Sequence, residues 1–382
     1  MSARANRVGA GGPCRQCLRR SWLLAELGAV LERCARERAR LLELLQLEDE
    51  SLIEAVAGRR RGELRERHAA FDPGVDGGRP GVAAICRHER EYPQSLLGAS
   101  APALLHVDPS PGRLAGLLAA PAVAITGSTR ASDYGREVTR GLARGLAASG
   151  VTVIASLGDG IALAAHAGAL EARAGSVAVL GGGLAVSVPA RRRRLYGLLM
   201  RAGCAVSELP ADCRGRRWGA LASERIVAGL ASVTVLVEGA GTPAELTAAR
   251  LARTLGRTVA AVPGRVSSPL SDGPHALLLD GAELVRGPHD VLELLARNDR
   301  PGARLHAGAA AGLRRHAARL PPRLRETFEL VGAGSDTPDR LERAAPQASE
   351  LLLSLSELEL LGLLTRGDGG RYLPSQRGHA EP

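Results

Sequence analysis

Lysine is absent from this chain, and all 50 of its basic residues are arginines. Without lysine, the chain can form neither a lysine Schiff base nor a phosphate-binding loop of the G-K-[ST] type. Arginine forks still suit bidentate contacts to phosphate groups. Because the formal net charge is +10, we expect an anionic partner, nucleic acid in preference to a membrane.

Aromatic residues and long apolar runs are also scarce. The 382 residues include two Trp, four Tyr and two Phe, so base stacking can contribute little to nucleic-acid binding. The longest apolar stretch, Leu114–Thr126, is short and contains Pro121, which argues against a membrane span. The first residues lack the apolar segment of a signal peptide. We therefore expect a cytoplasmic protein that makes no membrane contact.

Cysteines are few and scattered, which excludes a disulfide-rich scaffold. The six cysteines stand at positions 14, 17, 34, 86, 204 and 213. Cys14 and Cys17 have the spacing of half a zinc site, with Cys34 as a distant third ligand, but no fourth ligand lies at a suitable spacing. We therefore expect reduced thiols and neither a metal nor a cofactor.

Five apolar runs that end at glycines, each followed by an amphipathic stretch, fill the middle of the chain. They cover residues 123–126, 151–156, 176–180, 233–238 and 258–263. Such alternation predicts an α/β fold with a Rossmann-like, doubly wound parallel sheet. Ligands bind where loops leave the carboxyl ends of such strands, because helix N-termini and backbone amides point there. We therefore place the function in this crevice.

The composition also changes along the chain, which predicts further domains. A Leu- and Arg-rich pattern at helical spacing precedes a Gly/Pro segment, and near the end a helical stretch precedes a glycine turn within 365–372. We expect a helical N-terminal domain (1–70), a linker and irregular lead-in (71–120), the Rossmann-like domain (121–297), a linker (298–318), a winged-helix domain (319–375) and a tail (376–382). For the last domain, a packing or dimerising role is favoured over direct DNA contact, since its main helix carries few basic residues.

The first crevice loop combines hydroxyls, amides and one full charge. Gly127 permits a sharp exit from its strand, Ser128, Thr129 and Ser132 follow, and Arg130 adds the charge. A helix opening near this loop directs its positive end toward an anion, so phosphate binding is favoured over the alternative of a capped helix start with Ser132 as N-cap. The loop is not G-x-G-x-x-G, which argues against a nicotinamide cofactor.

The second loop contains an acid where an anion would be repelled. Asp159 lies between Gly158 and Gly160, and His166 follows near Glu171. A catalytic dyad of His166 and Glu171 is conceivable, but we expect a packed, hydrogen-bonded histidine.

Arginines stand at two further helix starts. The run Arg191–Arg194 follows the triple glycine, with Tyr196 as either a base-stacking or a core residue, and Arg225 is the best single anion contact on its side. In the fifth loop Thr242 caps a helix that begins at Pro243. No catalytic residue is predicted. The predicted phosphate contacts are Gly127, Ser128, Thr129, Arg130, Ser132, Gly158, Gly160, Arg191, Arg192, Arg225, Gly241, Thr242 and Gly264.

Many motifs in order along the chain resemble the DNA-processing protein A family (DprA, also called Smf). They include LRRSWLLAEL, YPQSLLGASAPALLHV, VAITGSTRASDYG, GIALAAHAGAL, SVAVLGGGL, VSELP, ERIVAGL, VLVE, AVPG and DGPHALLLDGAELV. The resemblance implies a cytoplasmic, non-enzymatic homodimer that binds single-stranded DNA and helps to load RecA during recombination and natural transformation.

Several loops depart from the family pattern. Thr129 stands where G-S-R-x-x-S has its Arg, and S-G-x-A-x-G-I-D appears as residues 155–162 without the closing Asp. R-N-R survives as Ser223-Glu224-Arg225, and S-G-x-L-x-T-A becomes residues 242–248. Affinity is therefore low, or the arginines at 191–194 compensate, or this is a divergent copy with a shifted role.

Two alternatives come from other classes of protein. Residues 239–245 resemble the G-G-x-G-T-x-x-E loop of nucleotide phosphoribohydrolases, in which the acid, here Glu245, would stabilise a ribosyl cation. The partner arginine motif of those enzymes is absent. The other alternative is a partner-binding module with a defunct crevice.

Overall fold

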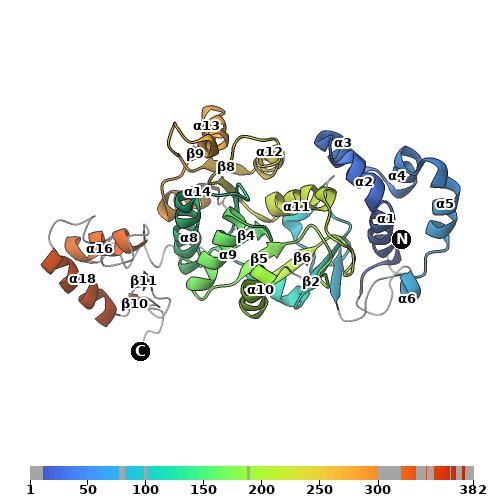
Figure 1. Cartoon of the computed structure of the whole chain (residues 1–382). Coiled ribbons are helices and arrows are strands. Elements are labelled where there is room, and N and C mark those ends of the chain that lie inside the picture. Colours follow the sequence, from blue (N-terminus) through green and yellow to red (C-terminus); the bar gives the residue numbers. More distant parts are fainter. Residues whose placement is uncertain are drawn as a thin grey trace.

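The computed structural model describes residues 12–76, 82–98, 101–186, 190–298, 320–332, 341, 348–361, 363–366 and 372–374. Its centre is a sheet of nine strands in the order β1-β2-β6-β5-β4-β3-β7-β8-β9 (Figure 1). The strands from β6 to β9 in this order are parallel. The predicted α/β fold with a mostly parallel sheet is therefore confirmed.

All five predicted apolar runs form strands. They are β3 (Ala122–Thr126), β4 (Thr152–Ser156), β5 (Ser176–Val179), β7 (Val233–Leu236) and β8 (Thr258–Ala261). Their residues are almost all buried, as expected for parallel strands covered on both faces. Two further strands, β6 (Cys204–Ser207) and β9 (Glu283–Leu284), were not predicted. β9 has only two residues, and both are exposed, so it leaves no apolar run in the sequence.

The segment expected to be an irregular lead-in contributes two strands to the sheet. β1 (Ala83–Cys86) and β2 (Leu104–Asp108) pair antiparallel, and β2 pairs antiparallel with β6. The expectation of a lead-in without strands is therefore wrong. Only tertiary pairing with β6 makes β2 an inner strand, and short antiparallel edge strands carry a weak sequence signal.

Helices cover both faces of the sheet and form two cores. One core contains buried residues of α8, α9 and α14, and the other contains residues of α7 and α11. α10 and α12–α13 pack at further positions along the sheet. Their bounds are α7 (Pro111–Leu118), α8 (Asp133–Ala148), α9 (Ile161–Glu171), α10 (Ala190–Ala202), α11 (Arg217–Leu230), α12 (Thr247–Thr254), α13 (Asp272–Leu279) and α14 (Pro288–Asn298).

The N-terminal helices form a separate core that also takes in α11. Leucines of the first helices pack around Trp218 of α11, whose side chain is fully buried, and Figure 1 shows α2 and α3 beside α11. The helices are α1 (Arg15–Glu26), α2 (Gly28–Cys34), α3 (Arg38–Gln46), α4 (Asp49–Val56), α5 (Arg61–Ala69) and the short α6 (Pro73–Asp76).

The C-terminal unit consists, in its described part, of two helices and an antiparallel ribbon. α16 (Pro322–Gly332) packs against α18 (Ala348–Leu360), and β10 (Leu364–Arg366) pairs with β11 (Tyr372–Pro374). Nearly all of the predicted linker 298–318 and the tail 376–382 lie outside the described residues. Along the described chain, no helix is both long and apolar enough to cross a bilayer.

Candidate nucleic-acid interface

The order of the strands reverses between β3 and β7. Strands β4, β5 and β6 continue on one side of β3, whereas β7, β8 and β9 lie on the other. The loops that follow β3 and β7 therefore leave the sheet side by side in opposite directions, which is where doubly wound sheets bind ligands. These loops cover residues 127–132 and 237–246.

A carboxylate from the β7 loop fills the N-terminus of α8. The Glu238 carboxylate accepts hydrogen bonds from the Ser132 amide at 2.9 Å and from its hydroxyl at 2.6 Å. Ser132 Oγ in turn accepts from the Gly135 amide, so Ser132 is the N-cap of α8. A Cβ on Gly135 would lie 2.1 Å from Glu238 Oε2, so this helix turn is shaped to the carboxylate. An internal anion thus takes the place that the sequence assigned to phosphate.

Gly127 and Gly160, in the first two loops, each lie against the backbone of another crevice loop. A Cβ on Gly127 would lie 2.5 Å from the Glu238 carbonyl oxygen, and one on Gly160 would lie 2.2 Å from the Ser128 carbonyl oxygen. Gly160 also has φ +63°, and the Ile161 amide donates to the same Ser128 oxygen. Their absent side chains therefore bring two backbones together. At Gly158 a Cβ would meet only ordinary contacts.

Within the first loop, the exposed residues are Thr129 and Arg130. Ser128 is 5% exposed, and its hydroxyl accepts from the Arg130 amide at 3.2 Å. In the described residues the Arg130 side chain forms no ion pair, so its charge faces solvent beside the crevice. Of the phosphate contacts predicted in this loop, those of Thr129 and Arg130 therefore stay predictions, because these two side chains are exposed.

Arg225 is buried and paired, contrary to the sequence prediction. It lies inside α11, not at a helix start, and its guanidinium donates to the carboxylate of Glu208, which is also buried. The preceding Glu224 is partly buried, and burial raises its pKa to about 7. The assignment of Arg225 as an exposed anion contact is therefore wrong: the helix buries this side chain against Glu208, which directly follows β6.

The arginine run of α10 is only partly described. Arg193 and Arg194 are exposed, whereas the side chains of Arg191 and Arg192 lie outside the described ones. Tyr196 belongs to the core: it packs with Leu199, and burial raises its pKa to about 12. Core packing, one of the two alternatives considered for Tyr196, is thus the observed role.

The β7 loop forms a turn before its helix. Thr242 Oγ1 donates to Glu245 Oε2 at 2.9 Å, and the Glu245 amide donates back to Thr242 Oγ1 at 3.4 Å. α12 begins at Thr247 rather than at Pro243. A Cβ on Gly264 would lie 2.2 Å from Ser271 Oγ, and the nearest atoms to a Cβ on Gly241 belong to Asp272 and Gly273 at the start of α13. These two glycines therefore face protein.

Three exposed arginines that were not predicted lie at the same edge of the sheet. Arg214 and Arg216 follow β6, and Arg265 follows β8. None of the three forms an ion pair with residues that the structure describes. The signal was present in Cys213-Arg-Gly-Arg-Arg217, a basic cluster directly before a helix. With Arg130, they give the carboxyl edge of the sheet four solvent-facing charges.

An exposed aromatic residue was missed as well. Tyr134, in the first turn of α8, is 50% exposed, and its hydroxyl donates to the Pro263 carbonyl at 3.3 Å. Its ring therefore stands between the loops that follow β3 and β8. A ring so placed can stack a base.

His166 is a packed core residue, as expected. Its Nδ1 lies 2.9 Å from Ser176 Oγ and its Nε2 lies 3.2 Å from the Ser156 carbonyl. Glu171 instead pairs with Arg140 and Arg144, so the His166–Glu171 dyad does not form. Burial lowers the pKa of His166 to about 4.

The lowered pKa of His166 predicts a loss of stability in mild acid. The unfolded chain binds a proton near pH 6.5 and the folded chain only near pH 4, so stability falls as pH drops through this window. Between pH 7 and 5 the loss is about 2 kcal/mol. Glu224, with its raised pKa, acts in the opposite direction. The effect of His166 is therefore measured by comparing wild type with His166→Gln, which keeps Glu224. In urea unfolding, the free energy of unfolding of wild type relative to this variant should fall between pH 7 and pH 5. A difference that does not change with pH would contradict the prediction.

Comparisons with known proteins agree with this architecture. The model of the family described as DNA recombination-mediator protein A matches residues 83–296. The putative DNA processing protein DprA of Mycobacterium tuberculosis is 35% identical over 255 residues, which cover 65% of this chain and 63% of that protein. Protein Smf of Escherichia coli is 35% identical over 252 residues, covering 65% of this chain and 66% of that protein. The match to the first of these thus spans less than two thirds of its length.

Among solved structures, the chain resembles DNA processing protein A of Streptococcus pneumoniae. The TM-score is 0.58 at 26% identity, and the match covers 72% of this chain and 95% of that one.

The strand order, the two-faced helix cover and the paired loops at the reversal define a doubly wound, Rossmann-like α/β protein. More specifically, the chain belongs to the DNA recombination-mediator protein A family, since the family model matches over half of its residues. The resemblance noted in the sequence is thereby confirmed.

Proposed function

We propose that this protein binds single-stranded DNA along the carboxyl edge of its sheet and acts, without catalysis, in recombination and in uptake of transforming DNA. The observation that carries the proposal is the set of exposed arginines there: Arg130, Arg214, Arg216 and Arg265. Membership of the DNA recombination-mediator protein A family supports it. The Ser132 amide and hydroxyl at the N-terminus of α8 are not part of the proposed contact surface, because Glu238 accepts their hydrogen bonds.

Binding of this kind is dominated by phosphate neutralisation. Each phosphate contact made by an arginine releases counterions, so the affinity falls as salt rises, whatever the sequence of the strand. Tyr134 adds one stacking position beside these charges, and stacking tolerates any base. We therefore expect salt-sensitive, sequence-independent binding.

Replacing the exposed arginines tests the proposal. We expect Arg130→Ala, Arg214→Ala and Arg216→Ala each to weaken binding and to lower the slope of log affinity against log salt by about 0.7, because each removes one phosphate contact. The measurement is fluorescence anisotropy of labelled oligo-dT at several salt concentrations. Arg59→Ala is the matched control, since Arg59 is an exposed arginine of the N-terminal helices and should leave the slope unchanged. Unchanged slopes in all three variants, or no binding at low salt, would overturn the proposal.

The finer roles rest on the family resemblance. We propose that the bound strand is passed to RecA, which is testable as faster RecA filament assembly on strands coated by a single-strand binding protein. We also propose a homodimer, to be measured by light scattering. Leu279, which is 91% exposed, and Leu284 on the edge strand β9, which is 49% exposed, are apolar surface suited to such a contact.

The C-terminal unit is proposed to be a winged helix that packs or dimerises. Its described helices and ribbon suit that assignment, and Arg366 of the ribbon is engaged with Glu359 and with the ring of Tyr372. An unchanged oligo-dT affinity in Arg366→Ala would agree with this role. A loss comparable to that of Arg214→Ala would instead indicate direct DNA contact.

The hydrolase alternative gains no support from the site. Glu245 is held by Thr242 in a turn, where its carboxylate stabilises the local backbone. Incubation with nucleoside monophosphates tests this directly, and release of free base that disappears in Glu245→Ala would reinstate the alternative.

A further inference from the structure

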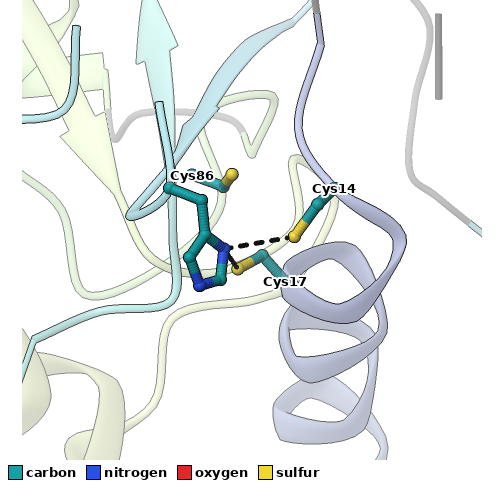
Figure 2. A group of neighbouring side chains, drawn as sticks. Cys14, Cys17 and Cys86 are labelled. Atoms are coloured by element: carbon teal, nitrogen blue, oxygen red, sulfur yellow. Dashed lines mark hydrogen bonds between the residues drawn. The ribbon is translucent and has the colours of Figure 1, made fainter. Parts of the chain in front are cut away.

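Three buried thiols and one imidazole meet where α1 approaches the edge of the sheet. Cys14 directly precedes α1 and Cys17 lies in its first turn, whereas Cys86 ends β1 and His88 follows two residues later. Figure 2 shows Cys14, just before the helix, and Cys17, in its first turn, on the side that faces Cys86. The three sulfur atoms and His88 Nδ1 all lie within 4.8 Å of one another. Two segments that are about seventy residues apart thus place four donor atoms around one point.

The distances match the size of a tetrahedral metal site. Zinc bonds of about 2.3 Å to sulfur and 2.0–2.1 Å to nitrogen place neighbouring donors about 3.6–3.8 Å apart. The Sγ atoms of Cys14 and Cys17 lie 3.3 and 3.4 Å from His88 Nδ1. Small side-chain shifts therefore suffice to close the site around an ion.

We propose that Cys14, Cys17, Cys86 and His88 bind one zinc ion. Three thiolates and one imidazole form a Cys₃His ligand set, and the C-x-x-C spacing of the first pair is typical of zinc ligands. Because all four positions come from the protein, the ion has no open coordination position, so its role is structural rather than catalytic. Cys34, which the sequence offered only as a distant third ligand, lies outside this group, and the proposal departs from the sequence expectation of no metal.

The surroundings favour a metal over other uses of the thiols. All three cysteines are free. A disulfide between any two of them would not account for the third thiol and the imidazole beside it. Cys204 gives the contrast: it is equally buried, but it packs among apolar residues in the core of the sheet. Burial alone therefore does not gather cysteines around a histidine in this protein.

The loop after β1 is shaped to present its two donors together. The Cys86 amide donates to Glu89 Oε2 at 2.7 Å, and the Arg87 amide donates to the Ala103 carbonyl at 3.1 Å. These bonds turn the backbone so that Cys86 and His88 face α1. Apart from the cysteines, Leu104 is the one fully buried member of the local apolar cluster, so a bound ion would strengthen the local contact between the start of α1 and the β1 edge of the sheet.

The test is metal analysis of the full-length protein purified under reducing conditions. We expect about one zinc per chain by inductively coupled plasma mass spectrometry, and loss of that zinc in Cys17→Ser and in Cys86→Ser. Cys34→Ser and Cys213→Ser are matched controls and should keep it. Cobalt reconstitution of the wild type should give visible d–d bands together with a thiolate charge-transfer band, and the His88→Asn variant should change the d–d bands.

A measurement on the wild-type protein tests the proposal even if a variant fails to fold. Removing the metal with a strong chelator should lower the thermal midpoint of unfolding by more than about 5 °C, and added zinc should restore it. The proposal is overturned if wild type neither contains zinc nor binds cobalt with a charge-transfer band. It is overturned equally if Cys17→Ser and Cys86→Ser retain a full complement of zinc.

Discussion

Arg225→Met is expected to lower the free energy of unfolding by about 3–5 kcal/mol, because it leaves the buried Glu208 carboxylate without its guanidinium partner. Both side chains are less than one tenth exposed, so water cannot take over the lost pairing. Denaturation in urea, followed by circular dichroism, measures the change.

Two control variants distinguish the cost of the unpaired Glu208 charge from the general effect of replacing an arginine with methionine. The double variant Arg225→Met/Glu208→Gln should recover part of the loss, since it removes the uncompensated charge. Arg250→Met, at an exposed position of α12, should change stability by less than about 0.5 kcal/mol. If Arg225→Met instead weakens DNA binding with normal stability, the arginine is a phosphate ligand, as the sequence suggested.

Gly160→Ala is expected to cost about 3–5 kcal/mol and to disturb both crevice loops. Its φ of +63° is unfavourable for alanine, and its Cβ would lie 2.2 Å from the Ser128 carbonyl oxygen, a backbone atom that cannot rotate away. Because the Ile161 amide also donates to that oxygen, the loop carrying Arg130 must move. Weaker oligo-dT binding should therefore accompany the lower stability.

A glycine-to-alanine change at another place controls for the substitution itself. A Cβ at Gly141, within α8, would meet nothing within 4 Å, so Gly141→Ala should be neutral or stabilise by up to about 1 kcal/mol. Normal stability and normal DNA binding in Gly160→Ala would show that the two loops do not pack as described.

Local patterns in the sequence determined the α/β class of the central domain and five strands of its sheet. Parallel strands covered on both faces must be continuously apolar, so the runs that became β3, β4, β5, β7 and β8 were visible without a structure. The packed His166 was also expected, because a histidine within an apolar helix is most easily accommodated by hydrogen bonds. The family, too, was recognisable from its motifs.

Only the tertiary structure decided which charges and thiols face which partner. Glu238 reaches Ser132 across 106 positions of the chain, Arg225 finds Glu208 through the turn of α11, and Cys86 meets Cys14 through the antiparallel edge of the sheet. No local sequence pattern predicts these three contacts, because they depend on the order of the strands and on how each helix is rotated about its axis. The same physics separates the arginines: a guanidinium that the fold buries must be paired, whereas Arg130, Arg214 and Arg216 stay exposed to solvent and available to a polyanion.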